Sequence, residues 1–141
     1  MGNWDSHGSL LLVKAAIWMK NKKLSDSFRN AFTGISEAFA RERNMRIHLA
    51  AAIICVILGL ILRLDAVRWS ILFIAIGLVF AAELVNTAIE NLVDMITNEY
   101  SQKAKAVKDI AAGAVLVAAA VAVMLGVFVF LPPLLRLAGL L

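Results

Sequence analysis

The chain has 141 residues, of which 62% are hydrophobic and only 17% are charged, with a formal net charge of +4. Soluble domains carry about 25% charged residues, so this composition excludes an ordinary soluble globular domain. The single cysteine, Cys55, excludes an intrachain disulfide and is expected to behave as a small buried apolar residue.

Residues 1–24 are expected to form a loose N-terminal segment, within which residues 10–19 suit a short helix at the membrane interface. The next segment, residues 25–42, has an apolar stripe at helical spacing and polar residues on its opposite face. The stripe consists of Phe28, Ala31, Phe32, Ile35, Ala38 and Phe39. The pattern predicts an amphipathic helix on the membrane surface. The alternative is a helix packed on a soluble domain, but the sequence has no such domain for it to cover.

Three apolar runs follow, and we expect spans at about residues 45–62, 69–96 and 108–131. A span needs about 20 apolar residues to cross about 30 Å of hydrocarbon. The third run reaches that length alone, whereas the first two include polar residues at their inner ends. Residues 63–68 suit a tight outer turn and residues 97–107 a longer inner loop. The predicted fold is an all-α integral membrane domain over residues 25–135, with residues 136–141 as the C-terminal end.

The basic residues are distributed unevenly along the chain. Of the 14 Lys and Arg residues, eight lie between Lys14 and Arg46, three lie between Ile96 and Ile110, and two lie in the outer turn. The positive-inside rule therefore places the N-terminus and the second connection in the cytoplasm and the C-terminus outside, in a bacterial cell (inner) membrane. The basic N-terminal segment is expected to attract anionic lipid and not nucleic acid.

The third span carries a stripe of small residues, Ala114, Ala118 and Ala122, at a spacing of four. Such stripes let another helix approach closely. Three spans make a thin bundle, so the stripe predicts a homo-oligomer.

Polar residues gather on one face of the second span. Glu83, Asn86, Glu90 and Asp94 fall within an arc of about 80° at 100° per residue. Each carboxylate at membrane depth costs about 2.5–3.5 kcal/mol on insertion scales, so such residues usually mark function. A seam that joins helices by hydrogen bonds would more naturally use Ser, Thr or Asn. A divalent cation or Lys108 is expected to neutralise these acids.

The position of the acids favours interfacial chemistry over transport. They occupy the cytoplasmic half of the span, whereas a coupled transporter needs its acids near the midplane. Carboxylates with an amide suit Mg²⁺ bound together with substrate phosphates. Zinc is disfavoured because His7 and His48 are far apart in the sequence and there is no cysteine pair. The sequence has no Walker A or protein-kinase motif, so Mg²⁺ and Lys108 would hold a nucleotide.

At these residues the sequence resembles the prokaryotic diacylglycerol kinase family, including its undecaprenol kinase branch. The likeness covers roughly residues 25–130. Its motifs, in chain order, are Phe28-Arg29-Asn30-Ala31-Phe32-x-Gly34, Glu42-Arg43-Asn44-x-Arg46-Ile47-His48, Glu83-x-x-Asn86-Thr87-Ala88-Ile89-Glu90-x-x-x-Asp94, Asn98-Glu99-Tyr100 and Lys108-Asp109-x-Ala111-Ala112-Gly113.

The resemblance implies an ATP-dependent lipid kinase with three spans and a surface helix, assembled as a homotrimer whose subunits share active sites. It implies that Glu83 is the general base and that Asn86 places the lipid hydroxyl and the γ-phosphate. Glu42 and Glu90 would bind Mg²⁺. The residues themselves indicate Glu83 and Glu90, whereas Glu42 between two arginines reads as a solvated ion pair.

The resemblance also implies a nucleotide site. Lys108 would neutralise phosphate charge with Asp109 nearby, and Asp94 would support the site. The segment Glu99-Tyr100-Ser101 would border the nucleotide, with Ser101 in the place of a frequent His.

The resemblance leaves the lipid acceptor open between two lipids. Residues 42–48 look like the undecaprenol branch, so undecaprenol is the first choice and diacylglycerol the second. His48, taken alone, reads as an interfacial histidine bonded to backbone. The alternative from another class is a non-enzymatic protein, either a small cation-coupled carrier or an assembly partner.

Overall fold

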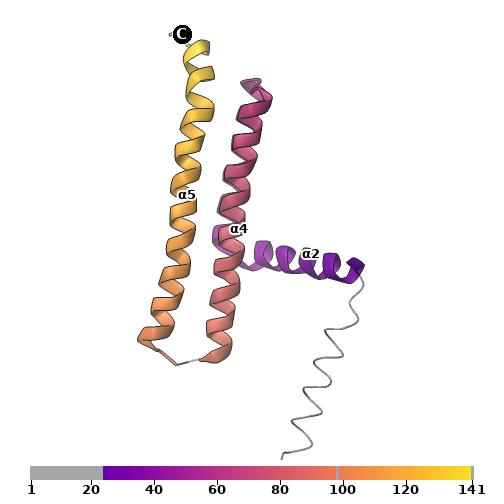
Figure 1. Ribbon diagram of the computed structural model, residues 1–141, viewed down its shortest axis with the longest axis vertical. Helices are drawn as coiled ribbons and strands as arrows, with labels where there is room; N and C mark the ends of the chain where they lie inside the picture. Colours follow the sequence, from indigo (N-terminus) through magenta and orange to yellow (C-terminus); the bar gives the residue numbers. More distant parts are fainter. Residues whose placement is uncertain (1–23, 98, 141) are drawn as a thin grey trace, which may run out of the picture. The chain divides into compact units, whose positions relative to one another are not determined.

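The computed structural model of the protein describes residues 24–97 and 99–140 (Figure 1). Over these ranges every regular element is a helix, and the elements are α2 (Leu24–Arg41), α3 (Arg43–Ile61), α4 (Ala66–Ile96) and α5 (Gln102–Leu137). The chain divides into two compact units, residues 1–37 and 38–141. The helix expected at residues 10–19 lies outside the described residues.

Helices α3, α4 and α5 are each long and apolar enough to cross a membrane. Over the described residues the protein is therefore all-α with three candidate membrane spans, as the apolar runs predicted. The helices differ from the expected spans mainly at their ends. Helix α5 begins at Gln102 instead of about residue 108 and continues to Leu137 instead of about residue 131.

The early start of α5 shortens the expected inner loop from residues 97–107 to residues 97–101. Ser101 is the N-cap of α5, and its hydroxyl accepts a hydrogen bond from the backbone N–H of Ala104 at 3.5 Å. This cap satisfies one of the donors that a helix start leaves free. The basic residues that resembled a loop therefore form the first turns of the helix.

The far end of α5 contains Pro132 and Pro133 without a break in the helix. Proline already has a helical φ of about −65° but cannot donate its backbone hydrogen bond. Tertiary packing supports this segment, since Val129 is buried in an apolar cluster with Leu64 and Leu72. Packing therefore extends the helix past the point where sequence signals end it.

The connection between α3 and α4 is the tight turn that the sequence predicted. Arg63 has a positive φ of 50°, and the N–H of Leu64 donates to the carbonyl of Gly59 at 3.1 Å. A Cβ at Gly59 would lie 2.9 Å from Cη2 of Trp69. Glycine at this position therefore lets the indole of α4 close over the end of α3.

Helices α4 and α5 run side by side and are joined by residues 97–101 (Figure 1). Helix α3 packs on α4. The buried residues of α4 and α5 repeat at helical spacing, and they include Ala118 of the small-residue stripe. Ala118 is thus used for packing within the chain. The homo-oligomer inferred from the stripe stays a prediction.

Helix α2 closely matches the segment expected at residues 25–42. Phe28, Phe32 and Ile35 of its apolar stripe are exposed. Its position on a membrane surface stays a prediction.

Candidate active site

A polar cavity of about 290 Å³ lies beside α4 in the second unit of the chain. Glu83, Asn86 and Glu90 line it from α4, and Asn44 and His48 line it from α3. Residues of α5, from Ala112 to Ala119, complete its wall. The structure thus brings three of the four residues of the predicted polar face into one space, which we call the carboxylate cavity.

Glu83 is the central residue of the carboxylate cavity. Its side chain is only 1% exposed, and its Oε2 atom has no hydrogen-bond partner among the described residues. His48 and Glu90 line the same cavity. Because buried polar atoms are nearly always paired, an unpaired carboxylate oxygen in a membrane helix needs an explanation. Binding of a substrate or a cation at this cavity supplies one.

Asn86 and Glu90 form a pair one turn apart on α4. The Nδ2 atom of Asn86 donates a hydrogen bond to Oε1 of Glu90 at 3.0 Å, and the buried Oδ1 of Asn86 is left without a partner in the described structure. The bond orients the Glu90 carboxylate and leaves an amide oxygen free. Both groups are therefore available as hard oxygen ligands.

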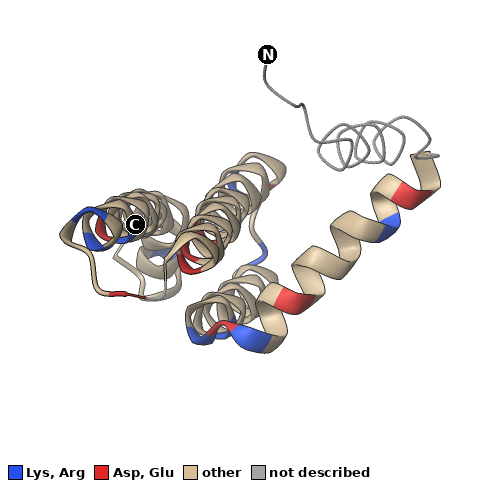
Figure 2. Ribbon diagram, turned by 90° about the horizontal axis from the view of Figure 1, so that it is seen from below, with Lys and Arg blue, Asp and Glu red and all other residues tan. Residues whose placement is uncertain are grey.

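A second cavity, of about 510 Å³, lies where α4 ends and α5 begins, and we call it the loop cavity. Six predicted nucleotide-site residues line it: Asp94, Glu99, Tyr100, Ser101, Lys108 and Asp109. Figure 2 looks onto this end of the molecule and shows acidic residues on α4 and basic residues at the start of α5. Most of the residues predicted from the sequence to bind ATP therefore lie around one cavity.

Two ion pairs organise the loop cavity. Lys108 Nζ lies 2.5 Å from Oδ1 of Asp94, across the two helices, and Lys105 Nζ lies 2.5 Å from Oδ2 of Asp109 on α5. The sequence offered Lys108 as a neutralising partner for the acids of α4, and the structure pairs it with Asp94, the acid nearest the loop. Both lysines are only partly buried, so their ammonium groups remain accessible to an anion.

Glu42 lines neither of these cavities. It is the N-cap residue of α3, with φ −88° and ψ 124°, and its side chain makes no capping hydrogen bond. Its carboxylate thus does not cap α3 and lies outside the wall of the carboxylate cavity.

The oxygen ligands of the carboxylate cavity fit Mg²⁺ as a nucleotide-bridging ion. Across the described ranges no group of three or more His, Cys, Asp or Glu side chains forms a ready cation cage. Mg²⁺ does not need one, because it is usually held by one or two carboxylates, waters and substrate phosphates. The free Oδ1 of Asn86 and the carboxylates of Glu83 and Glu90 are suitable hard donors.

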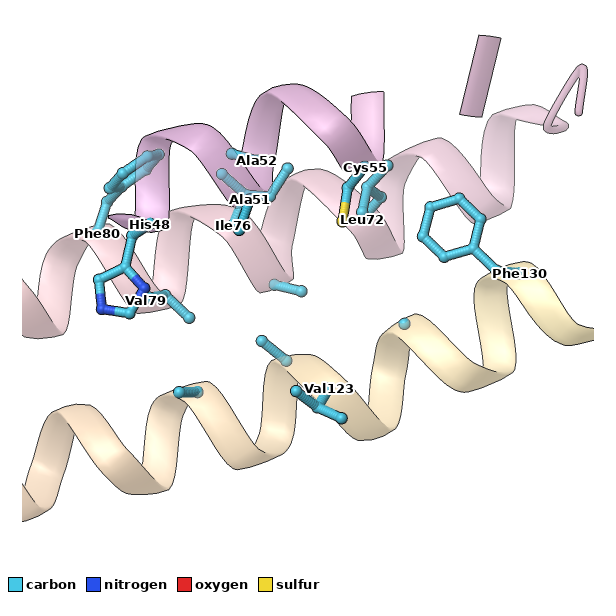
Figure 3. Close-up of a pocket in the computed structure, with 14 residues that line it drawn as sticks. His48, Ala51, Ala52, Cys55, Leu72, Ile76, Val79, Phe80, Val123 and Phe130 are labelled. Atoms are coloured by element: carbon cyan, nitrogen blue, oxygen red, sulfur yellow. The ribbon is translucent and has the colours of Figure 1, made fainter. Parts of the chain in front are cut away.

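A third space is an apolar groove of about 250 Å³ between α3, α4 and α5 (Figure 3). His48 lies at one end of this groove and Phe130 at the other, with Cys55 and Leu72 between them. His48 and Ala119 line both the groove and the carboxylate cavity. The apolar groove therefore lies next to the carboxylate cavity that Glu83 lines.

Sequence reasoning missed part of this site. Asn44 and His48 enter it from α3, and no periodicity within α4 could indicate a neighbour on another helix. Lys105 was also not selected, although its spacing of four from Asp109 is a signal for an ion pair on a helix.

Comparison with known proteins gives a consistent result. The profile of the family described as prokaryotic diacylglycerol kinase matches residues 29–130. A protein of Bacillus subtilis named undecaprenol kinase is 46% identical over 108 residues, which cover 77% of this chain and 88% of the relative. A diacylglycerol kinase of Synechocystis sp. is 43% identical over 85% of this chain and 69% of the relative. A diacylglycerol kinase of Escherichia coli is 33% identical over 67% of this chain and 77% of the relative.

The residues matched by the family profile include α3, α4 and most of α5, the helices that supply the walls of the two polar cavities and the apolar groove. The chain therefore belongs to the prokaryotic diacylglycerol kinase family, a family of lipid kinases.

Proposed function

We propose that this protein transfers the γ-phosphoryl group of ATP to the hydroxyl of a membrane lipid at the cytoplasmic face. One observation carries the proposal: a buried glutamate, Glu83, has an unpaired carboxylate oxygen in a polar cavity that adjoins an apolar groove. A lipid alcohol is the kind of substrate that needs both environments at once.

Undecaprenol is our first choice of acceptor, and diacylglycerol is the second. The Bacillus subtilis relative carries the name undecaprenol kinase, and the residues from Glu42 to His48 look like that branch. The relatives from Synechocystis and Escherichia coli are named diacylglycerol kinases, which keeps the second lipid as the alternative.

Glu83 is proposed as the general base. As its carboxylate takes the proton of the lipid hydroxyl, the hydroxyl oxygen attacks the γ-phosphorus. A new oxygen–phosphorus bond forms, and the bond between the γ-phosphorus and the bridging oxygen breaks with ADP as the leaving group. Asn86 is proposed to place the hydroxyl and the γ-phosphoryl group. Such a sparse site is sufficient, because phosphoryl transfer depends mainly on positioning and charge neutralisation.

The residues of the loop cavity are proposed to hold the nucleotide. Lys108 neutralises phosphate charge, and Asp94 and Asp109 hold the neighbouring lysines through the two ion pairs. The residues from Glu99 to Ser101 border the nucleotide at the cavity wall. Glu90 and Glu42 would hold Mg²⁺, which would supply positive charge to offset the negative charge on the phosphates.

The protein is further proposed to act as a homotrimer in the bacterial inner membrane, with its N-terminus in the cytoplasm and its C-terminus outside. The basic residues before α3 and at the start of α5 support this orientation by the positive-inside rule. In a homotrimer with shared sites, a neighbouring subunit would complete the open side of each carboxylate cavity.

The decisive experiment replaces Glu83 with glutamine in the full-length protein. Glu83→Gln keeps the shape of the side chain but removes the base, so lipid phosphorylation should fall by at least about 10²-fold, the usual contribution of general base catalysis. ATP binding and oligomeric state should be retained. Transfer from labelled ATP is measured with undecaprenol and with diacylglycerol side by side.

Glu37→Gln is the matched control, because Glu37 is exposed on α2 and belongs to no cavity described above. Its activity should equal that of the unaltered protein. If the unaltered protein phosphorylates neither lipid, the kinase proposal fails. If Glu83→Gln instead dissociates the oligomer, Glu83 serves assembly, as expected for a non-enzymatic carrier or assembly protein.

A further inference from the structure

Small residues from all three helices form part of the wall of the apolar groove. They are Ala51 and Ala52 of α3, Ala75 of α4, and Ala119, Ala122 and Gly126 of α5. Larger side chains at these positions would fill part of the space. In Figure 3 the groove extends from His48 to Phe130.

The dimensions of the apolar groove fit one hydrocarbon chain. A 150 Å³ apolar cavity holds a benzene ring, so the groove's 250 Å³ corresponds to roughly ten carbon atoms. Along α5 the groove reaches from Ala119 to Phe130, about 16 Å at 1.5 Å per residue. An extended chain advances about 1.1–1.2 Å per bond, so that length takes about fourteen bonds. Two chains lying side by side over this length would need far more volume than the groove has.

The shared residues of the two spaces indicate what the occupant is. His48 and Ala119 line both the apolar groove and the carboxylate cavity, so we expect a chain in the groove to place its polar end toward Glu83. A neighbouring helix could fill an apolar groove, but it would place no hydroxyl beside the unpaired oxygen of Glu83. An alcohol with a single hydrocarbon tail would fill the apolar groove with its tail and place its hydroxyl in the carboxylate cavity.

We infer that the apolar groove binds the first ten to fourteen carbons of the acceptor's chain and so selects alcohols with one hydrocarbon chain over those with two. This inference rests on the proposed kinase function. In diacylglycerol the second acyl chain leaves the glycerol next to the hydroxymethyl group, and the groove has no room for it. A polyprenol carries one chain, and its first two to three isoprene units fill the groove.

Gly126→Leu tests the inference, because the new side chain enters the groove. A Cβ at Gly126 has no atom within 4 Å, so a side chain can start there without a clash at its first carbon. Displacing roughly two buried methylene groups should raise the KM for a polyprenol of three or more isoprene units by about tenfold. The KM for ATP should not change. Both are measured on the full-length protein in mixed micelles.

Gly77→Leu is the matched control, since Gly77 also has open space around its Cβ, is exposed on α4 and lines no cavity described above. It should leave both KM values unchanged. For the unaltered protein, kcat/KM should rise from a five-carbon prenol to a fifteen-carbon farnesol and then level off. It should be about tenfold or more higher for farnesol than for a diacylglycerol with two long chains.

The outcomes separate the inference from the kinase proposal. If phosphorylation occurs but Gly126→Leu and Gly77→Leu behave alike, or if diacylglycerol is the better substrate, the inference about the groove is wrong and the kinase proposal stands. If Gly126→Leu changes the oligomeric state and not the KM, a second copy of the chain occupies the groove. Failure of every lipid to accept phosphate contradicts the kinase proposal itself.

Discussion

At the residue scale, three of the four polar side chains of α4 could be placed from sequence alone. Spacings of three and four put Glu83, Asn86 and Glu90 on one face of the helix, and the structure brings them to one cavity. Asp94, the fourth, turns to Lys108 in the loop cavity. Helical periodicity predicts a shared face, but it does not predict which partner each side chain meets.

The side chains that approach from other helices were harder to predict. Asn44 and His48 reach the carboxylate cavity only because α3 packs on α4. The local sequence of α3 does not predict this tertiary contact. Glu42 was named by resemblance, and its free side chain at the start of α3 leaves its metal role a prediction.

Glu90→Gln tests the magnesium role. The change removes one negative ligand while the hydrogen bond from Asn86 can persist, because the side-chain carbonyl of glutamine also accepts. Loss of a charged interaction of about 1.5–3 kcal/mol should raise the magnesium concentration for half-maximal activity by about tenfold or more. The measurement is a magnesium titration at fixed ATP, with Glu37→Gln as the control. Superimposable titration curves would remove Glu90 from the metal site.

At the scale of elements, the existence of the three spans followed from apolar run length, but their ends did not. Helix α5 starts at Gln102 because Ser101 caps it, although its first turns are basic and resemble a loop in the sequence. It also continues through two prolines because Val129 is buried against α4. Local sequence signals thus predict the wrong helix end where a capping residue or tertiary packing determines that end.

The start of α4 depends on Asp65, whose carboxylate accepts a hydrogen bond from the backbone N–H of Arg68 at 3.0 Å. This bond, and then the charge of the Arg68 guanidinium, hold the pKa of Asp65 below its ordinary value. Because the folded pKa is the lower one, the carboxylate stabilises the fold above its unfolded pKa. That contribution is lost as the pH falls through the folded pKa.

Asp65→Ala should therefore lower the thermal unfolding midpoint in detergent at pH 7, because it removes the cap of α4. The difference from the unaltered protein should shrink as the pH is lowered below about 4, where the aspartate becomes protonated. Asp65→Asn is the control, since it keeps a capping oxygen without a charge, and its stability should depend less on pH. An equal loss at pH 7 and at pH 3 would show that the charge of Asp65 does not contribute.

At the scale of the whole molecule, the site exists only because three helices meet. The sequence indicated the acids of α4 and the phosphate-handling residues around the start of α5, but not the apolar groove that α3, α4 and α5 form together. Alanine and glycine at the groove wall look like ordinary membrane-helix residues. The size of such a space depends on the distances between helices, and no single apolar run of the sequence predicts those distances.

The orientation of the chain can be tested with two cysteine variants and a membrane-impermeant maleimide. Val67 is exposed near the α3–α4 turn, and Lys103 lies at the start of α5. Val67→Cys should react in intact cells, whereas Lys103→Cys should react only after the membrane is permeabilised. The unaltered protein is the background control, because Cys55 lies within the span α3. The opposite labelling pattern would invert the proposed orientation.

The unpaired oxygen of Glu83 has a consequence for anyone who engineers this protein. A neutral side chain there would be easier to accommodate inside the membrane than a carboxylate. A selection for heat resistance alone would therefore be expected to enrich neutral variants at this position, and on the proposed mechanism these more stable variants would no longer phosphorylate lipid. Improving such an enzyme requires that activity be scored alongside robustness from the first round.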